Sequence, residues 1–449
     1  MEYLWTKGVE PPRFPALEGD LRTGVLVIGG GMAGVLCLRQ LRDRGVDCVL
    51  AEGNRIGMGI TKGTTAVLSA QHDVLYSDLI RRRGADQAKR YLEANLRAVE
   101  GFRELSRTIP CDFQDMPSVM YSLTERDVLE QEARAVRSLG FPAEFLTSGA
   151  PLPFRVAGAV KYPGMAQFHP LKFLWGAAKG LNIREHTFVR RLEGTTAYTD
   201  RGKITAKKVI VATHFPFVNR RGLYFMKLYQ KRSFVLALEN APKLPCTAVG
   251  YGKDGMYFRP YGDLLLAGGG DRRTGKNGGF EAVREFVRRC FPEAREKYAW
   301  ANQDCISLDQ IPYIGPYSPA MPDVFTATGF NEWGMTTSFA AASLLADLAL
   351  GRPNADASLY APDRSMLHPQ LFCNAGSTLK DFLIPTVKRC PHLGCALKWN
   401  RAEHSWDCPC HGSRFDCLGR LISGPAQTDL DSSLRTGRRS LPPSVERSP

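Results

Sequence analysis

The chain has 449 residues, of which 44% are hydrophobic, 10% aromatic and 23% charged. This composition excludes a wholly disordered chain, and the length allows two to four domains at roughly 100–200 residues each. No apolar run approaches the roughly 18–20 residues that span a bilayer, and the first residues show no basic segment followed by an apolar one. We therefore predict neither a transmembrane segment nor a secretory signal, and expect a cytoplasmic location.

The net charge is +14, from 59 Lys and Arg against 45 Asp and Glu. Such an excess is compatible with acidic substrates, anionic surfaces or nucleic acid. The basic residues are scattered in pairs and one triplet, Arg81 to Arg83, and form no stripe interleaved with aromatic residues. A solvated basic surface is favoured, and no nucleic-acid partner is predicted.

Hydrophobic periodicity predicts a series of elements along the chain. In order, these are a strand at 25–28, a helix at 35–44, a strand at 46–51, helices at 75–107 and 124–138, strands within 183–211, 232–239 and 256–268, and helices at 281–300 and 335–350. The strand–helix–strand start predicts a parallel sheet covered by helices. We predict a linker at 363–385 and a disordered basic tail at 432–449.

The 12 cysteines are unevenly placed, since five fall between Cys390 and Cys417 and the other seven are isolated. A disulfide framework would space its cysteines through the fold. The pattern instead indicates a reducing compartment and one cysteine-dense site near the C-terminus.

A dinucleotide-binding motif follows the first predicted strand. It consists of Gly29, Gly31 and Gly34, followed after 18 residues by Glu52. The first glycine permits a tight turn, the second lets the backbone approach a pyrophosphate, and the third lets helix and strand pack closely. The helix N-terminus offers free N–H groups, and Glu52 can accept hydrogen bonds from a ribose hydroxyl.

Four further segments accompany this motif, at 55–66, 209–214, 311–316 and 326–336. Together they resemble the glycine/D-amino-acid oxidase family of FAD-dependent oxidoreductases over most of residues 20–355. The resemblance implies an α/β fold, in which a Rossmann-like FAD-binding domain is interleaved with a β-sheet substrate domain. The FAD-binding segments are expected at about 20–75, 155–220 and 305–355, and the substrate segments at about 76–154 and 221–304, all within 1–362.

The same resemblance assigns the FAD-binding residues. They are Gly29, Gly31, Gly34, Glu52, Arg55, Thr61, Thr65, Gly329, Gly334, Met335 and Thr336. The turn at Gly334 to Thr336 is expected to present a helix N-terminus to the flavin N1–C2=O edge, where the reduced flavin is anionic. A second, nicotinamide site is not predicted, because Arg273 stands where the third glycine of Gly268-Gly269-Gly270 would be needed.

The C-terminal cysteines form a second motif. Cys390-Pro391-His392 is followed, after fifteen intervening residues, by Cys408-Pro409-Cys410-His411. This resembles a Rieske [2Fe-2S] domain, here expected at 386–431. The resemblance implies that Cys390 and Cys408 hold one iron as thiolates and that His392 and His411 hold the other as neutral imidazoles, which raises the cluster potential.

Further features are implied by the Rieske resemblance. Cys395 and Cys410 match the disulfide pair of the family, and Ser413 matches a hydroxyl donor to a bridging sulfide. Phe415 stands where high-potential members carry a Tyr donor. Only 25 residues separate Arg364 from Cys390, so the domain is expected to be truncated, and its stability without the flavin domain is left open. A zinc ribbon is the alternative, but it normally uses two CxxC pairs or CxxC with HxxxH.

These motifs predict an enzyme that oxidises an amine, an amino acid or a related small substrate on FAD. Electrons then pass to the [2Fe-2S] cluster and on to an external acceptor. One alternative is a non-catalytic redox sensor or electron-transfer flavoprotein. Another is a Rieske oxygenase, which needs a mononuclear iron on two histidines and a carboxylate, but the six histidines outside the motif show no close pair.

The substrate site is assigned to one predicted strand. Tyr257 and Arg259 alternate along it and point the same way, so a guanidinium beside a phenol could clamp a carboxylate against the flavin. A packed Tyr under a surface Arg is the competing interpretation. The substrate, the acceptor, the mode of FAD attachment and the oligomeric state are left open by the sequence.

Overall fold

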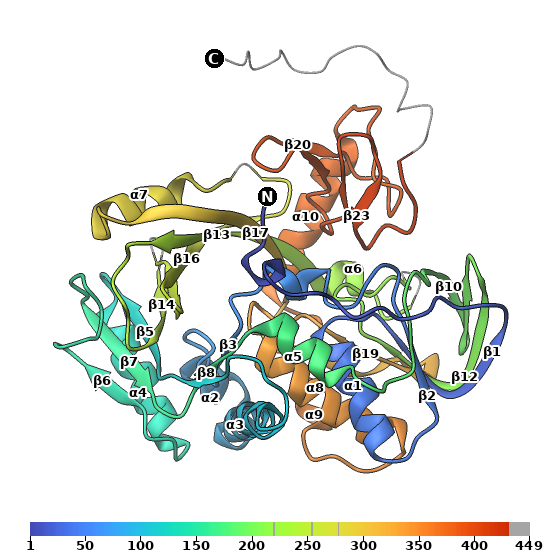
Figure 1. The fold of residues 1–449 in the computed structure, drawn as a ribbon, viewed down its shortest axis with the longest axis horizontal. Helices are drawn as coiled ribbons and strands as arrows, with labels where there is room; N and C mark the ends of the chain where they lie inside the picture. Colours follow the sequence, from blue (N-terminus) through green and yellow to red (C-terminus); the bar gives the residue numbers. More distant parts are fainter. Residues whose placement is uncertain (219–220, 253–254, 277, 431–449) are drawn as a thin grey trace.

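The structure is a computed structural model that describes residues 1–218, 221–252, 255–276 and 278–430. The tail predicted at 432–449 lies outside the described residues. Two large sheets and a small C-terminal sheet make up the architecture (Figure 1). The predicted α/β fold with a C-terminal all-β domain is confirmed.

The first large sheet carries the nucleotide-binding motif. Its strands are β1 (Leu21–Ile28), β2 (Cys48–Ala51), β9 (Ile183–Arg184), β10 (Val189–Glu193), β11 (Thr196–Thr199), β12 (Gly202–Val211), β18 (Tyr313–Ser318) and β19 (Met321–Thr328). The central strands β12, β1, β2 and β9 pair in parallel, as do β12 and β19. The last four residues of β1 and all of β2 are buried, as expected for parallel strands with helices on their faces.

The second large sheet stands beside the first. In spatial order its strands are β17 (Arg295–Ser307), β13 (Leu228–Glu239), β16 (Leu264–Arg273), β15 (Tyr257–Tyr261), β14 (Thr247–Tyr251), β5 (Ser118–Ser122), β7 (Gly158–Tyr162) and β6 (Glu144–Leu146). All its pairings are antiparallel except that of β14 with β5. The predicted FAD-binding segment 155–220 therefore contains one strand, β7, that pairs in the second sheet. A short sheet joins β3 (Val67–Leu68), β8 (Ala166–Gln167) and β4 (Gln114–Asp115).

Helices cover the sheets. They are α1 (Met32–Asp43), α2 (Tyr76–Arg83), α3 (Ala85–Ser106), α4 (Arg126–Ser138), α5 (Pro170–Ala177), α6 (Tyr224–Lys227), α7 (Glu281–Cys290), α8 (Gly334–Ala349) and α9 (Ala357–Tyr360), with 3₁₀ turns η1 (Leu4–Thr6) and η2 (Ile60–Gly63). None of the described helices is long and apolar enough to cross a membrane.

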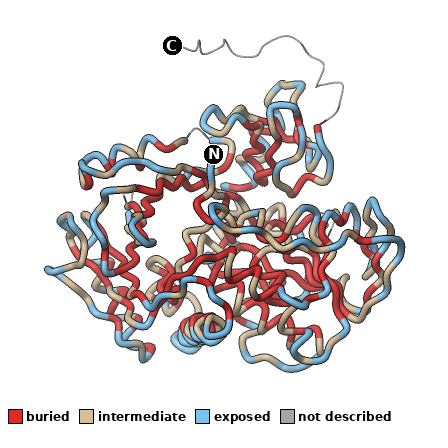
Figure 2. The backbone as a smooth tube through the Cα atoms, in the orientation of Figure 1, coloured by how far each residue is buried: buried red, intermediate tan, exposed pale blue. Residues whose placement is uncertain are grey.

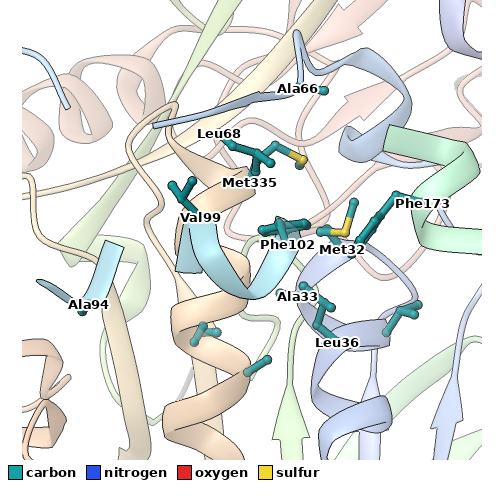
Figure 3. Close-up of a cluster of buried hydrophobic side chains, with 14 of the residues drawn as sticks. Met32, Ala33, Leu36, Ala66, Leu68, Ala94, Val99, Phe102, Phe173 and Met335 are labelled. Atoms are coloured by element: carbon teal, nitrogen blue, oxygen red, sulfur yellow. The ribbon is translucent and has the colours of Figure 1, made fainter. Parts of the chain in front are cut away.

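Buried residues are concentrated where α1, α3, α5 and α8 meet the first sheet (Figure 2). Figure 3 shows Met32 of α1, Phe102 of α3 and Phe173 of α5 gathered in this core. The rings of Phe102 and Phe173 lie 4.8 Å apart, centroid to centroid. This packing fixes the start of α1, where the nucleotide-binding loop that begins at Gly29 ends.

Two predicted helices differ from those in the structure. The helix predicted at 75–107 is divided at Gly84, whose φ of +84° is unfavourable for other residues. The helix predicted at 281–300 was wrong beyond Cys290: the chain enters β17 at Arg295 instead. Pro292 explains the break, because a proline disfavours helical backbone in the residue before it, and Phe291 has non-helical backbone with φ −139° and ψ 65°.

The C-terminal domain is a four-stranded antiparallel sheet. Its strands are β20 (Lys398–Asn400), β21 (Ser405–Asp407), β22 (Arg414–Phe415) and β23 (Leu421–Ser423). The segment predicted as a linker at 363–385 contains α10 (Pro369–Leu383), so it is not an irregular connection. The buried Asn374 of α10 accepts a hydrogen bond from Arg273 of β16 at 3.1 Å. The helix is thereby joined to the second sheet.

A buried ion-pair network joins the C-terminal domain to β13. The Glu403 carboxylate contacts Arg232 of β13, with Nε–Oε2 at 2.8 Å, and Arg414 of β22 at 2.9 Å. Arg414 also pairs with Asp407 at 2.9 Å. The side chains of Arg232 and Glu403 are 5% and 0% exposed. Breaking such a buried pair leaves an uncompensated charge, which is strongly destabilising.

We predict that Glu403→Gln weakens the docking of the C-terminal domain by about 3–5 kcal/mol, because Arg232 loses its charged partner in a buried site. Hydrogen–deuterium exchange of peptides from β21 and β22 should accelerate accordingly. The matched control is Glu296→Gln, which removes the half-exposed pair with Arg284 and should change stability by less than about 1 kcal/mol. Equal exchange in both variants and the wild type would contradict a role of this network in docking.

Candidate functional site

A cavity of about 510 Å³ opens where several parallel strands of the first sheet end. Ile28 of β1, Ala51 of β2 and Thr328 of β19 line it, and this edge of a parallel sheet is where such folds bind ligands. Seven of the predicted FAD-binding residues line the cavity: Gly29, Gly31, Glu52, Thr61, Gly329, Gly334 and Met335. Its volume is typical of a cofactor site.

The glycine motif forms a backbone cradle at the base of this cavity. A Cβ on Gly29 would lie 2.6 Å from the Ala212 carbonyl oxygen, and Gly29 has a φ of +108°. A Cβ on Gly34 would lie 1.9 Å from the Gly29 oxygen, so Gly34 serves helix–strand packing and does not line the cavity. A Cβ on Gly31 would meet nothing closer than 3.6 Å, which leaves the α1 N-terminus open to the cavity. These roles match those of the three glycines in a dinucleotide loop.

Glu52 lies at the end of β2 and is held by two backbone groups. The N–H of Gly30 donates to Oε2 at 2.7 Å, and the N–H of Asn54 donates to Oε1 at 2.8 Å. Burial raises the pKa of Glu52, although these two hydrogen bonds oppose the rise. Each carboxylate oxygen has a second lone pair, so the fixed side chain can accept hydrogen bonds from a ribose.

Three other predicted FAD-binding residues lie outside the cavity lining. Arg55 donates to the carbonyls of Pro11 and Pro12. Thr65 offers its carbonyl to Arg259, and the Thr336 hydroxyl donates to the Ser69 carbonyl at 3.0 Å. Their assignments to FAD stay predictions. Helix α8 does begin at Gly334 on the cavity wall, where its N-terminus favours negative charge.

One wall of the cavity comes from the C-terminal domain and was missed by the sequence analysis. Leu421 to Gln427, comprising β23 and the loop after it, line the same cavity as the glycine motif. Ser413 is linked to this loop, because the Ala426 N–H donates to its hydroxyl at 3.0 Å. No local signal in the sequence indicates this contact, because it depends on how two domains dock. The residues present fit a dinucleotide covered by the C-terminal domain.

The predicted cluster ligands lie in two loops of the C-terminal domain. Cys390 and Cys408 are both 1% exposed and belong to one small core. A hydrogen bond with the adjacent Cys408 thiol, followed by burial, raises the pKa of Cys390. The rings of His392 and His411 lie 4.9 Å apart, centroid to centroid. The structure thus brings the two cysteines together and the two histidines together.

His411 is oriented for metal binding by the flavin-binding part of the chain. Its Nε2 lies 3.0 Å from the Phe225 carbonyl oxygen and can donate to it, while its buried Nδ1 has no hydrogen-bond partner. Burial, and secondarily His392, lower the pKa of His411 to about 3, so the ring is neutral. A neutral ring with one nitrogen fixed and the other unpaired is the form that ligates a metal. The donor set therefore fits a Rieske cluster.

The expected disulfide between Cys395 and Cys410 is not formed in the structure, where both are free thiols. Their sulfur atoms and that of Cys408 all lie within 4.8 Å of one another. Because a third thiol shares the space between the loops, the arrangement does not isolate one pair, and the pairing stays a prediction. Among the described residues, these three cysteines are the only group of three or more His, Cys, Asp or Glu gathered this closely.

The two residues of the predicted carboxylate clamp, Tyr257 and Arg259, are packed within the fold and do not line the cavity. Arg259 is 1% exposed, and its guanidinium donates to Gln167 Oε1 at 3.0 Å, to the Phe168 carbonyl at 2.7 Å and to the Thr65 carbonyl. These three acceptors engage three of the five N–H groups of the guanidinium, so Arg259 joins segments of the fold, and its assignment to substrate stays a prediction. Tyr257 packs its ring over Gly268, where a Cβ would come within 2.2 Å of it.

The cluster ligands adjoin the cavity through one aromatic ring. Phe215 lines the cavity, and its ring centroid lies 6.3 Å from that of His392 and 6.0 Å from that of His411. His214, the preceding residue, also lines the cavity. A single aromatic side chain therefore separates the dinucleotide cavity from both predicted histidine ligands.

Comparison with known proteins agrees with both motifs. The model of the FAD dependent oxidoreductase family matches residues 24–348, and that of the Rieske [2Fe-2S] domain matches residues 379–434. A Bacillus subtilis protein described as "Putative Rieske 2Fe-2S iron-sulfur protein YhfW" is 32% identical over 96% of this chain and 98% of its own. The predicted family, domain combination and cofactors, FAD and a Rieske [2Fe-2S] cluster, are confirmed.

Solved structures share the fold of the larger part. Glycine oxidase from Geobacillus kaustophilus aligns with a TM-score of 0.65 at 22% identity, covering 77% of this chain and 100% of its own. L-proline dehydrogenase from P. horikoshii aligns with a TM-score of 0.65 at 17% identity, covering 77% and 98%. At these identities the likeness concerns the fold alone.

We predict that Glu52→Ala weakens FAD binding, because each lost charge-assisted hydrogen bond is worth about 1.5–3 kcal/mol. The variant should purify with little flavin, as measured by absorbance after denaturation. Glu18→Ala, which changes an exposed glutamate near the same sheet, is the control and should retain FAD. Full occupancy in Glu52→Ala would place Glu52 away from the ribose.

Anaerobically purified protein should contain two irons per chain and little zinc, because the Cys-x-His and Cys-x-x-His ligand set suits a Rieske cluster. Metal analysis by mass spectrometry, normalised to protein, measures both. One zinc per chain with no iron would refute the ligand assignment in favour of a zinc ribbon.

Proposed function

We propose, since the chain belongs to the family of FAD dependent oxidoreductases and carries a Rieske [2Fe-2S] domain, that it oxidises an amine, an amino acid or a related small molecule. In this proposal the electrons leave through the cluster to an external acceptor. The named relatives with this fold act on amino acids, namely glycine and L-proline. They support carbon–nitrogen chemistry as the class of reaction.

One observation supports the proposed transfer of electrons from FAD to the cluster. Phe215 lines the FAD cavity and contacts both predicted histidine ligands, with ring centroids 6.3 and 6.0 Å apart. The loop after β23 also covers the cavity, so the two cofactor sites share a wall. Proximity of this kind supports direct transfer within one chain, with no separate carrier between the two cofactors.

FAD, when bound, can take two electrons from a substrate as a hydride equivalent and release them singly to the cluster. The residues of the chain would bind the nucleotide, stabilise negative charge and cover the cavity. Glu52 and the glycine loop hold the nucleotide, and the α8 N-terminus at Gly334 stabilises negative charge at the cavity wall. The loop from Gly424 to Gln427 covers the cavity and limits access of water.

Anaerobic mixing with amines and amino acids tests the oxidation. A substrate should bleach the flavin absorbance, and the cluster absorbance should then change at the same or a slower rate. If no amine, amino acid or hydroxy acid reduces the flavin while the cluster exchanges electrons with carriers, the chain is an electron-transfer protein and the enzymatic proposal is wrong.

We predict that His411→Cys slows electron transfer beyond the flavin. Replacing a neutral imidazole by a thiolate adds negative charge to the cluster and lowers its potential, or destroys the cluster. Flavin reduction by substrate should survive, because that chemistry lies outside the C-terminal domain. Rapid-mixing spectroscopy separates the two steps in one experiment.

His404→Cys is the matched control, since His404 is exposed in the same domain and is not a predicted ligand. It should leave both steps at the wild-type rate. Loss of substrate-dependent flavin reduction in His411→Cys, with FAD still bound, would show that the cluster takes part in substrate chemistry and is not a downstream relay.

A further inference from the structure

Helix α10 turns its polar side toward the protein and its apolar side toward solvent. The residues that it buries are polar, namely Asn374 and Asp381, which lie two turns apart. By contrast, Phe372, Leu379 and Leu383 recur at the spacing of one helix face and are 68%, 61% and 69% exposed. A surface helix of a globular protein normally has the opposite arrangement, with its apolar face toward the core.

Polar contacts fix this orientation of the helix. Asn374 accepts a hydrogen bond from Arg273 at 3.1 Å and donates to the Met226 carbonyl at 3.4 Å. Asp381 forms an ion pair at 3.0 Å with Lys398 of β20, in the C-terminal domain beside which α10 lies (Figure 1). Turning the helix to bury its apolar side would leave these buried polar groups without partners, which is unfavourable. The apolar side therefore stays outside.

Exposed apolar side chains are concentrated in this segment. The outer apolar face, as we call it, consists of Phe372, Leu379, Phe382 and Leu383 of α10, and Leu367 and Val387 flank the helix. These six residues are among eleven large hydrophobic residues that are exposed in the described part of the chain. Single exposed apolar residues are common on proteins, whereas a contiguous group indicates an interaction surface.

Unpaired basic residues border the outer apolar face. Lys380 is exposed on α10, and Lys388 and Arg389 follow the helix. None of these three forms an ion pair with a described residue. Asp381 is the only acid between residues 365 and 397, and it is paired with Lys398. The surface therefore combines exposed apolar side chains with uncompensated positive charge.

The outer apolar face adjoins one of the two loops of predicted cluster ligands. The Phe382 ring packs against Gly394, where a Cβ would lie 3.3 Å from it. Arg389 joins the same two segments, because its guanidinium donates to the Phe382 carbonyl at 3.0 Å and to the Gly394 carbonyl at 2.8 Å. Leu393, which directly follows the predicted ligand His392, is exposed. Whatever covers the outer apolar face therefore lies next to this loop.

Charge and size favour one kind of partner for this surface. A second copy of the chain would bring two positively charged borders together, which is unfavourable. A helix about 22 Å long and about 10 Å wide also covers less than the roughly 800 Å² that each partner contributes to a stable interface. An anionic lipid surface attracts the basic residues, and its acyl chains can surround protruding apolar side chains without a matching groove.

We propose that α10 binds an anionic lipid surface, with Phe372, Leu379 and Leu383 at the boundary between headgroups and acyl chains and Lys380 among the headgroups. A helix bound in this way lies in the plane of the interface and does not cross it. Binding places the loop at His392 next to the lipid. The inference goes beyond the proposed function and holds whether or not the chain oxidises an amine.

Sedimentation of the holoprotein with lipid vesicles tests the binding. One vesicle preparation contains phosphatidylcholine alone, and the other contains equal parts of phosphatidylcholine and phosphatidylglycerol. We expect the protein to sediment with the mixed vesicles, less so at high salt, which screens the attraction, and to bind the neutral vesicles weakly. No binding to the mixed vesicles overturns the inference, as does equal binding to both preparations.

Substitutions on the outer apolar face locate the contact. Leu379→Ser and Leu383→Ser should each weaken binding to mixed vesicles about tenfold, from the lost burial of one leucine side chain. Leu418→Ser is the matched control, because Leu418 is 57% exposed on the connection between β22 and β23. All three variants should keep the FAD and iron contents of the wild type. Full binding by both α10 variants, or an equal loss in Leu418→Ser, contradicts the assignment to α10.

A charge variant and the association state complete the test. Lys380→Gln should weaken binding to mixed vesicles about fivefold, while Lys179→Gln, which changes an exposed lysine after α5, should leave it unchanged. Equal binding by both lysine variants and the wild type refutes the role of the basic border. In sedimentation velocity without lipid, Leu379→Ser and the wild type should have the same mass. A wild-type dimer that dissociates in Leu379→Ser assigns the outer apolar face to a second copy and overturns the inference.

Discussion

The contact between the His411 loop and two buried glutamines is the constraint on which the arrangement of both cofactor sites depends. Gln230 of β13 donates to the His411 carbonyl at 2.6 Å, and Gln303 of β17 donates to the Gly412 carbonyl at 2.9 Å. Gly412 has a φ of +82°, and a Cβ there would come within 2.7 Å of Gln230. Because buried amides must keep their partners, this loop has one favourable position. The predicted ligand is thereby fixed beside the wall of the FAD cavity.

Strand β13 contacts different parts of the molecule with its two faces, because its side chains alternate between them. Side chains on β13 point to opposite faces in turn, so Gln230 and Arg232 contact the C-terminal domain. On the other face, Lys231 lies near Glu332 and Ser233 donates to Asp271. A shift of one residue in the β13–β17 register would exchange these faces. The long pairing of β13 with β17 therefore fixes which side chains of β13 contact the C-terminal domain.

Local motifs explain which parts of the site could be predicted from the sequence. Gly29, Glu52 and Cys390 belong to short segments whose chemistry depends on spacing alone, and these segments also specify the fold class. Arg259 could not be assigned in this way, because its acceptors lie 91 to 194 residues away in the chain. The wall contributed by β23 and the helix α10 likewise depend on docking between distant segments. Periodicity predicted a helix at 281–300, but the helix ends at Cys290, just before Pro292.

Net charge is a poor guide to the ligand of this protein. The +14 of the whole chain is spread over exposed lysines and arginines, where water and salt screen it. Next to the cofactor cavity the local balance differs, because Asp304 and Glu332 stand near a single lysine, Lys231, and all three are partly buried. Interactions between charges are stronger where less solvent screens them, so the groups around a site decide what it attracts more than the charge of the whole chain does. The net charge of this chain therefore does not predict the charge of its ligand.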